Sequence, residues 1–132
     1  MISDVVDNPF LKTLGVERTA WREGYAEFRV QVKPGLLNRQ EVLQGGVIAT
    51  LLDAACGYSG LYSAERDRPI HGVTLSLTLN FLDKGLGHTA TAKGFLERKG
   101  RSIFFARGEA WVDDRTLIAT AQGTFKYARS TT

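Results

Sequence analysis

The sequence predicts an α+β fold in which a long antiparallel sheet of about six strands wraps one central helix. Three observations lead to this fold. An apolar stretch with helical periodicity, at about 45–64, supports one long helix. Two strand-like segments precede this helix and four follow it, and glycine-containing or charged turns separate most of them. The chain has 132 residues, which is enough to bury a core of this kind in a single domain, 1–132.

The first elements are a short helix and a hairpin. We expect a helix over 8–14 because an Asn-Pro pair suits its first positions and Gly15 ends it. Residues 16–22 and 25–32 then form a predicted β-hairpin. The second arm alternates between apolar and polar side chains, which is typical of a half-buried strand. Residues 34–40 form a loop that leads to the central helix.

The central helix carries no Lys, Arg, His or Glu, so it is not an ordinary surface helix with a charged outer face. At 100° per residue its large side chains share one wide face, which we assign to the core: Val47, Ile48, Leu51, Leu52, Ala55, Tyr58 and Tyr62. The opposite face is small except for one carboxylate: Ala49, Thr50, Asp53, Gly57 and Gly60. A backbone or a ligand could therefore approach closely, and Asp53 would lie in a poorly solvated slot. The alternative is a structural Asp that caps a turn or bonds a backbone amide.

After the central helix the chain is predicted to be β throughout. A charged turn over 66–69 is expected to be a solvated link. The strands that follow are alternating or apolar runs joined by short turns, predicted at 73–82, 89–97, 102–112 and 116–126.

Composition narrows the class of protein. The net charge of +3 is a weak bias toward anionic partners, and the scattered basic residues do not predict a nucleic acid partner. The single cysteine, Cys56, fits a reducing compartment and is expected to be a small buried side chain rather than a nucleophile. We see no secretory signal and no bilayer-spanning run, so we expect a cytoplasmic protein without a membrane partner. His71 and His88 are too few and too far apart to predict a metal site.

A motif with specific spacing runs through the centre of the chain: Asn38, then Gly45-Gly46, then Asp53, followed by Gly72-Val73-Thr74 and Leu79-Asn80-Phe81-Leu82. In these residues and in its order of elements, the chain resembles hotdog-fold thioesterases, in particular the PaaI-like branch of phenylacetic acid degradation. The resemblance implies hydrolysis of an acyl-coenzyme A thioester with an aryl-acetyl or medium-chain acyl group. No cofactor is implied, because coenzyme A is part of the substrate. Gln44 stands where the family has His.

The resemblance also implies roles for individual residues. Asp53 would act as nucleophile or as general base on a water molecule, and the Gly45 amide at the helix N-terminus would polarise the thioester carbonyl. Asn38 and Gln44 would orient the thioester or the water, although Gln44, unlike a His, cannot accept a proton. Thr74 would bond the attacking water or the carboxylate. The alternatives are structural: loop hydrogen bonds for the two amide side chains and a tight helix start for the glycines.

Contacts with coenzyme A are implied at the motif glycine Gly46 and at a basic turn that would bind phosphate groups. The turn consists of Arg98, Lys99, Gly100 and Arg101. The alternative for this turn is an ordinary solvated strand connection.

Helix geometry adds a condition on the assembly. Gly45 and Asp53 are eight residues apart, which separates them by about 12 Å along the helix axis. They cannot both touch one thioester carbon, so a site that uses both needs at least a dimer, and the resemblance implies a tetramer. Two other functions are open: an acyl-CoA binding or sensor protein without turnover, and a hotdog dehydratase or hydratase, whose usual His and acid pairing is absent near the helix.

Overall fold

The computed structural model describes residues 8–65 and 69–128, and the order of elements within them confirms the predicted α+β fold. The elements are α1 (Pro9–Leu14), β1 (Glu17–Arg22), β2 (Tyr25–Gln31), the 3-10 helix η1 (Pro34–Leu36), α2 (Gly45–Ser59), β3 (Gly72–Phe81), β4 (Thr89–Lys99), β5 (Ile103–Val112) and β6 (Thr116–Tyr127). Residues 66–68 of the predicted charged turn lie outside the described residues. Neither α1 nor α2 has the length and apolar character needed to cross a membrane.

The short helix α1 begins and ends as predicted. The side-chain oxygen of Asn8 accepts hydrogen bonds from the backbone amides of Phe10 and Leu11 at 3.0 and 3.1 Å. Gly15 ends the helix in the left-handed region, at φ 81°. The buried side chain of Leu11 anchors α1 in the core, and its carbonyl accepts a hydrogen bond from the amide of Val16 at 2.9 Å.

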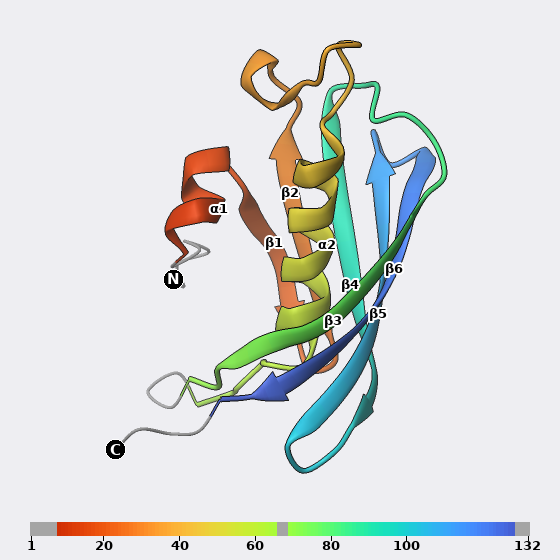
Figure 1. The fold of residues 1–132 in the computed structure, drawn as a ribbon. Helices are drawn as coiled ribbons and strands as arrows, with labels where there is room; N and C mark the ends of the chain where they lie inside the picture. The colour runs from red at the N-terminus through yellow and green to blue at the C-terminus, as the bar shows by residue number, and fades with distance from the viewer. Residues whose placement is uncertain (1–7, 66–68, 129–132) are drawn as a thin grey trace.

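The six described strands form one antiparallel sheet in the order β1-β2-β4-β5-β6-β3, and α2 lies along one face of it (Figure 1). Alternate residues of β2, β4, β5 and β6 point toward α2 and are buried, as the period of two requires. The largest fully buried side chains of this core are Phe28, Val30, Leu51, Leu52, Phe104, Ile118 and Phe125.

Small residues let α2 pack very closely against the centre of the sheet. A methyl group added at Gly94 of β4 would overlap the backbone carbonyl of Ala55, and one at Gly108 of β5 would lie 2.7 Å from the Cys56 sulfur. Cys56 is fully buried, as predicted, and burial together with the nearby Asp53 charge raises the pKa of its thiol to about 12. The sheet therefore fixes the position of the helix that carries Asp53.

The central helix is shorter than the predicted 45–64. It ends at Ser59, because Gly60 lies directly under the Phe104 ring and the Tyr127 hydroxyl donates a 3.1 Å hydrogen bond to the Gly60 carbonyl. The assignment of Tyr62 to the large face of this helix is therefore wrong. Its ring instead packs edge-on against Trp21, with centroids 5.6 Å apart.

Strand β3 forms one edge of the sheet and is unusually open for its length. Among the described residues it pairs only with β6, none of its ten residues is buried, and none is charged. Val73 and Leu75 are each 53% exposed and Phe81 is 56% exposed. Such an edge presents unpaired backbone groups to another strand, and it lacks the charges that commonly block such pairing.

Candidate active site

The start of α2 is held in place by two neighbouring segments. The amide of Gln44 donates to the Leu36 carbonyl, and the amide of Leu43 donates to the Gly85 carbonyl, both at 2.9 Å. The Gln44 side chain is exposed and makes no capping hydrogen bond. The first-turn amides of Gly45 and Gly46 have no acceptor within the helix, as at any helix start, so they are available to a ligand.

Asn38 organises the loop that precedes α2. Its side-chain oxygen accepts hydrogen bonds from the amides of Gln40 at 2.8 Å and Val42 at 3.3 Å. Its own backbone amide donates to the Val42 carbonyl at 2.8 Å, and Glu41 adopts φ 63° within this tight loop. The loop therefore occupies the oxygen of the Asn38 side chain, and the side-chain NH2 is the group that could donate to a ligand.

The carboxylate of Asp53 lies midway along α2 and is paired with Thr74 of β3. The Thr74 hydroxyl donates a hydrogen bond of 2.7 Å to Asp53 Oδ1, so two residues 21 positions apart in the sequence meet as the motif implied. Asp53 is half-buried rather than enclosed. It lies in a groove of about 260 Å³ between α1, α2 and the beginning of β3.

The groove includes residues that the sequence did not assign to the site. Tyr58, which we expected in the core, packs against Phe28 with ring centroids 5.0 Å apart and also lines the groove. The other groove residues are Asn8, Phe10, Leu11, Thr50, Ala54, Gly57, Leu61, Gly72, Val73, Phe104 and Phe125. Asp53 is the one charged residue among those described that line it.

The predicted catalytic residues form two separate sets within one chain. Asn38 and Gln44 line a cavity beside the start of α2, whereas Asp53 and Thr74 line the groove farther along the helix. The two cavities share no described lining residue. This separation agrees with the distance of about 12 Å between Gly45 and Asp53 along the helix axis.

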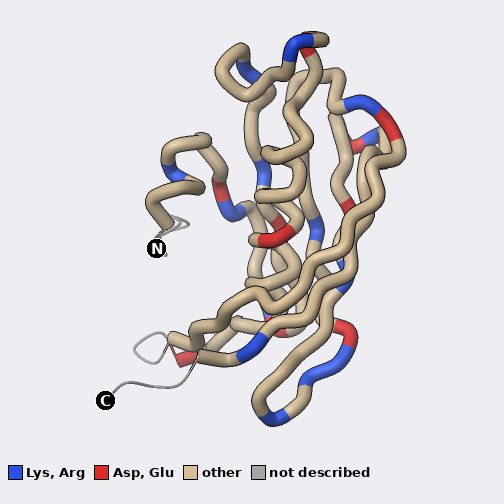
Figure 2. The backbone as a smooth tube through the Cα atoms, in the orientation of Figure 1, with Lys and Arg blue, Asp and Glu red and all other residues tan. Residues whose placement is uncertain are grey.

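The predicted basic turn is exposed at the tip of the β4–β5 hairpin (Figure 2). The Gly100 amide donates to the Ile103 carbonyl at 2.8 Å, and Lys99 Nζ lies 5.8 Å from the centroid of the Tyr127 ring. The tip of the hairpin lies beyond the C-terminal end of α2 (Figure 1), whereas Gly46 is in the first turn of that helix. One chain therefore does not bring the two predicted coenzyme A contacts together.

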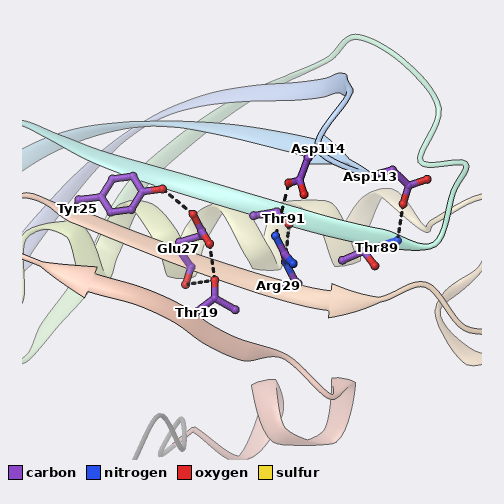
Figure 3. A network of polar contacts seen from close by, with 8 residues as sticks. All are labelled: Thr19, Tyr25, Glu27, Arg29, Thr89, Thr91, Asp113 and Asp114. Atoms are coloured by element: carbon purple, nitrogen blue, oxygen red, sulfur yellow. Dashed lines mark hydrogen bonds and ion pairs between the residues drawn. The ribbon is translucent and has the colours of Figure 1, made fainter. Parts of the chain in front are cut away.

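A polar network on the sheet face away from α2 is distinct from these sets (Figure 3). Glu27 accepts hydrogen bonds from Thr19 at 2.6 Å and Tyr25 at 2.8 Å. Burial acts to raise the pKa of Glu27, but these hydrogen bonds and the positive charges of Arg29 and Lys93 outweigh it and lower the pKa. The Arg29 side chain also donates to the Thr91 hydroxyl of β4 at 3.0 Å. The contacts therefore link β1, β2 and β4, and we assign the network a structural role.

Comparison with known proteins places the chain in a family. The model of the thioesterase superfamily matches residues 40–119. A medium/long-chain acyl-CoA thioesterase of Salmonella typhimurium is 32% identical over 130 residues, which cover 89% of this chain and 84% of the relative. The chain belongs to the thioesterase superfamily, a class of thioester hydrolases.

Solved structures share the fold of this chain. The PaaI protein from the phenylacetic acid degradation operon of E. coli has a TM-score of 0.82 and 22% identity, covering 95% of this chain and 88% of that one. A Bacillus halodurans protein solved with CoA has a TM-score of 0.79 and 26% identity, covering 94% and 81%. The hotdog fold inferred from the motif and the order of elements is confirmed.

Proposed function

We propose that this protein hydrolyses the thioester bond of an acyl-coenzyme A at a site that a second copy of the chain completes. The products are a carboxylic acid and the free thiol of coenzyme A. The observation that carries the proposal is the Asp53 carboxylate, held at 2.7 Å by Thr74 in a groove whose other described residues are uncharged. The activity named for the Salmonella relative supports acyl-CoA as the substrate. An aryl-acetyl or medium-chain acyl group is the expected acyl part.

In the proposed mechanism Asp53 either accepts a proton from an attacking water or attacks the carbonyl carbon itself. In the first route the activated water attacks the carbonyl carbon and expels the thiolate. In the second route the thiolate leaves as an anhydride forms between the acyl group and Asp53, and a water molecule then hydrolyses the anhydride, which releases the carboxylic acid and restores the carboxylate. In both routes the carbon–sulfur bond breaks and a proton from the water is transferred to the departing sulfur. Thr74 donates to one carboxylate oxygen and so fixes the orientation of the other. The Gly45 amide, with the Asn38 NH2 group and Gln44, donates to the carbonyl oxygen as negative charge develops there.

Strand β3 supports a specific geometry for the two-copy site. Thr74 contacts Asp53 at one end of β3, and the Phe81 ring lies 3.6 Å from a methyl position at Gly45 near the other end. Leu75 is an extra residue in β3, because Thr74 and Ser76 pair with the adjacent residues Phe125 and Thr124 of β6. A two-fold antiparallel pairing of two β3 strands centred on Thr78 would therefore place Thr74 of one copy opposite Phe81 of the other. Asp53 of one copy would then approach Gly45 of the second.

The coenzyme A part of the substrate is assigned to Gly46 and the basic turn. The guanidinium and ammonium groups at Arg98, Lys99 and Arg101 are exposed, and such groups bind phosphate well. We propose a tetramer as the assembled form and the cytoplasm as its compartment.

The first experiment measures thiol release from a panel of aryl and aliphatic acyl-CoA substrates by the wild type and by Asp53→Asn. The substitution keeps the shape of the side chain and removes its charge. We expect kcat to fall by about 10² or more with the fold retained, since loss of a general base has that effect. Binding of acyl-CoA without hydrolysis by the wild type would favour the binding protein instead.

The Gly45 amide can be tested directly, because Gly45 is the first residue of α2. Proline suits this position, and Gln44 at φ −61°, ψ 135° has the conformation that a residue before proline prefers. Gly45→Pro therefore removes the N–H group at little structural cost, whereas Gly45→Ala adds a side-chain carbon and keeps the N–H. We expect kcat to fall by about 10² in the Pro variant and by less than about tenfold in the Ala control.

Mixing the two inactive variants tests whether the site is shared. In a dimer of one Asp53→Asn chain and one Gly45→Pro chain, one of the two shared sites keeps both groups. Co-refolding equal amounts is therefore expected to restore roughly a quarter of the wild-type activity, since about half of randomly assorted dimers are mixed. A site within one chain would give no recovery, because every chain would lack one group.

A further inference from the structure

The groove beside Asp53 has a wall that the superfamily motif does not include. Besides α2 and β3, it is lined by Phe10 and Leu11 of α1 and by Asn8, the N-cap of this helix. We infer that α1 is the acyl-binding wall of the site and that Phe10 is a specificity-determining residue, which covers an extended acyl chain. The inference rests on the proposed function, because it places the thioester carbonyl at Asp53.

Phe10 and Leu11, the two residues of α1 that line the groove, face different surroundings. Leu11 is 3% exposed and holds α1 to the core, whereas the neighbouring Phe10 is 57% exposed. A single exposed aromatic residue is ordinary in itself. Phe10 differs from the other exposed phenylalanines, Phe81 and Phe105, because it lines the groove that contains the Asp53–Thr74 pair. Asn8 caps α1 and the buried Leu11 anchors it, so the position of Phe10 is set by the fold.

The chemistry of the groove favours a hydrocarbon occupant. Asp53 is the one charged residue among its described lining residues, so these residues offer no positive charge to the phosphate groups of coenzyme A. From Asp53 the face of α2 continues through the small residues Ala54 and Gly57, over about 6 Å along the helix. Two stacked rings also line the groove, Phe104 and Phe125, with centroids 5.1 Å apart.

These features favour a straight acyl chain of several carbons over an acetyl group. A chain whose carbonyl lies at Asp53 passes small side chains before it meets aromatic rings, with α1 beside it. Each added methylene that the groove buries should strengthen binding about fourfold, until the groove is filled. An acetyl group is too short to reach the wall formed by Phe10 and gains little from it.

The experiment measures binding by titration calorimetry with S-(2-oxoalkyl) thioethers of coenzyme A, which cannot be hydrolysed. The 2-oxopropyl and 2-oxoundecyl compounds are compared on the full chain of the wild type, Phe10→Ala and the control Phe105→Ala. Phe105 is 44% exposed, and its neighbours Phe104 and Ala106 are the residues that face α2, so it points away from the groove.

We expect Phe10→Ala to weaken binding of the long analogue about five- to tenfold, because a half-exposed ring can still bury roughly half of its surface. Its affinity for the short analogue should stay within about twofold, and Phe105→Ala should stay within about twofold for both analogues. With substrates, the ratio of kcat/KM for decanoyl-CoA to that for acetyl-CoA should fall by the same factor. Phe10→Leu, which keeps an apolar wall, should restore most of the preference.

Equal losses for both analogues, or no loss for the long one, would overturn the inference. The first result would show that Phe10 only supports the fold, and the second that the acyl chain lies elsewhere. Because the analogues do not react, the binding result does not depend on hydrolysis. A wild type that hydrolyses no acyl-CoA would refute the proposed function, while the chain-length dependence of binding would still decide the role of Phe10.

Discussion

Replacing Gly94 by Ala tests how closely α2 packs against the sheet. A methyl group at Gly94 would overlap the carbonyl carbon and oxygen of Ala55 and lie 2.7 Å from the Cys56 nitrogen, whereas ordinary contacts are 3.4–4 Å. The obstacles are backbone atoms of a helix, so no side-chain rotation relieves the overlap. The helix that carries Asp53 would have to move away from β4 by roughly 1 Å, because packed interiors have little free space.

The magnitude follows from the type of contact. Overpacking a protein core costs about 1–3 kcal/mol when side chains can adjust. Here the contact is with backbone, so we expect the free energy of unfolding to fall by about 3 kcal/mol. For a chain of this length, that loss corresponds to a decrease in Tm of roughly 10 °C. The shift of α2 should also displace Asp53 and lower the rate of thioester hydrolysis.

The assay is urea unfolding followed by circular dichroism, at one fixed protein concentration because an oligomer's stability depends on it. Gly35→Ala is the matched control. Nothing lies within 4 Å of a methyl group at Gly35, so its stability should stay within about 0.5 kcal/mol of the wild type. A Gly94→Ala protein as stable as this control would refute the close packing of α2 and, with it, the placement of Asp53.

Three further predictions follow from individual contacts. Thr74→Val removes the hydroxyl that donates to Asp53. It should lower kcat about tenfold, because a hydrogen bond to a charged group contributes about that much. An unchanged kcat in steady-state hydrolysis would contradict this. Cys56 is buried and its thiol has a pKa of about 12, so Ellman's reagent at about pH 8 should label the native protein slowly and the denatured protein fast; rapid native labelling would mean that α2 opens. The folded state lowers the pKa of Glu27, so its contribution to stability is present above the unfolded value near 4.3 and is lost as pH falls through the folded value. Glu27→Gln should therefore be less stable than the wild type at about pH 7, by less than about 1 kcal/mol because the group is partly exposed. This difference should shrink as the pH is lowered below the unfolded value, and a difference in urea unfolding that stays constant with pH would argue against it.

Local signals in the sequence account for most of the fold. The Asn8 cap and the left-handed Gly15 are visible in the sequence because they depend on neighbouring residues alone. The strands were predicted to within two residues at each end for a similar reason, since side-chain alternation is a local pattern. The end of α2 could not be predicted in this way. It depends on the Phe104 ring and the Tyr127 hydroxyl, which lie more than 40 residues away from Gly60 in the sequence.

In the candidate site too, the sequence predicts the features that depend on neighbouring residues and misses those that depend on distant ones. Asp53 was noticeable because it is one carboxylate in an apolar helix, but its contact with Thr74 followed only from the family resemblance. The engagement of the Asn38 side-chain oxygen by its own loop is a local pattern that sequence reasoning had offered as an alternative. Phe10 was missed, because nothing in the sequence indicates that α1 lies beside the groove of α2 and β3.

The open edge at β3 and the separation of Gly45 from Asp53 can both be explained by the need for a second copy of the chain. An uncharged edge strand of ten residues, with Val73 and Leu75 half-exposed, leaves backbone groups and apolar surface without a partner in the part of the chain that the structure describes. The single chain also leaves Gly45 too far from Asp53 for both to act on one carbonyl carbon. In the proposed antiparallel pair of β3 strands, one contact satisfies the sheet edge and brings Gly45 to the Asp53 of the other copy. Thr74 belongs to both functions, since it is part of the pairing strand and donates to the carboxylate.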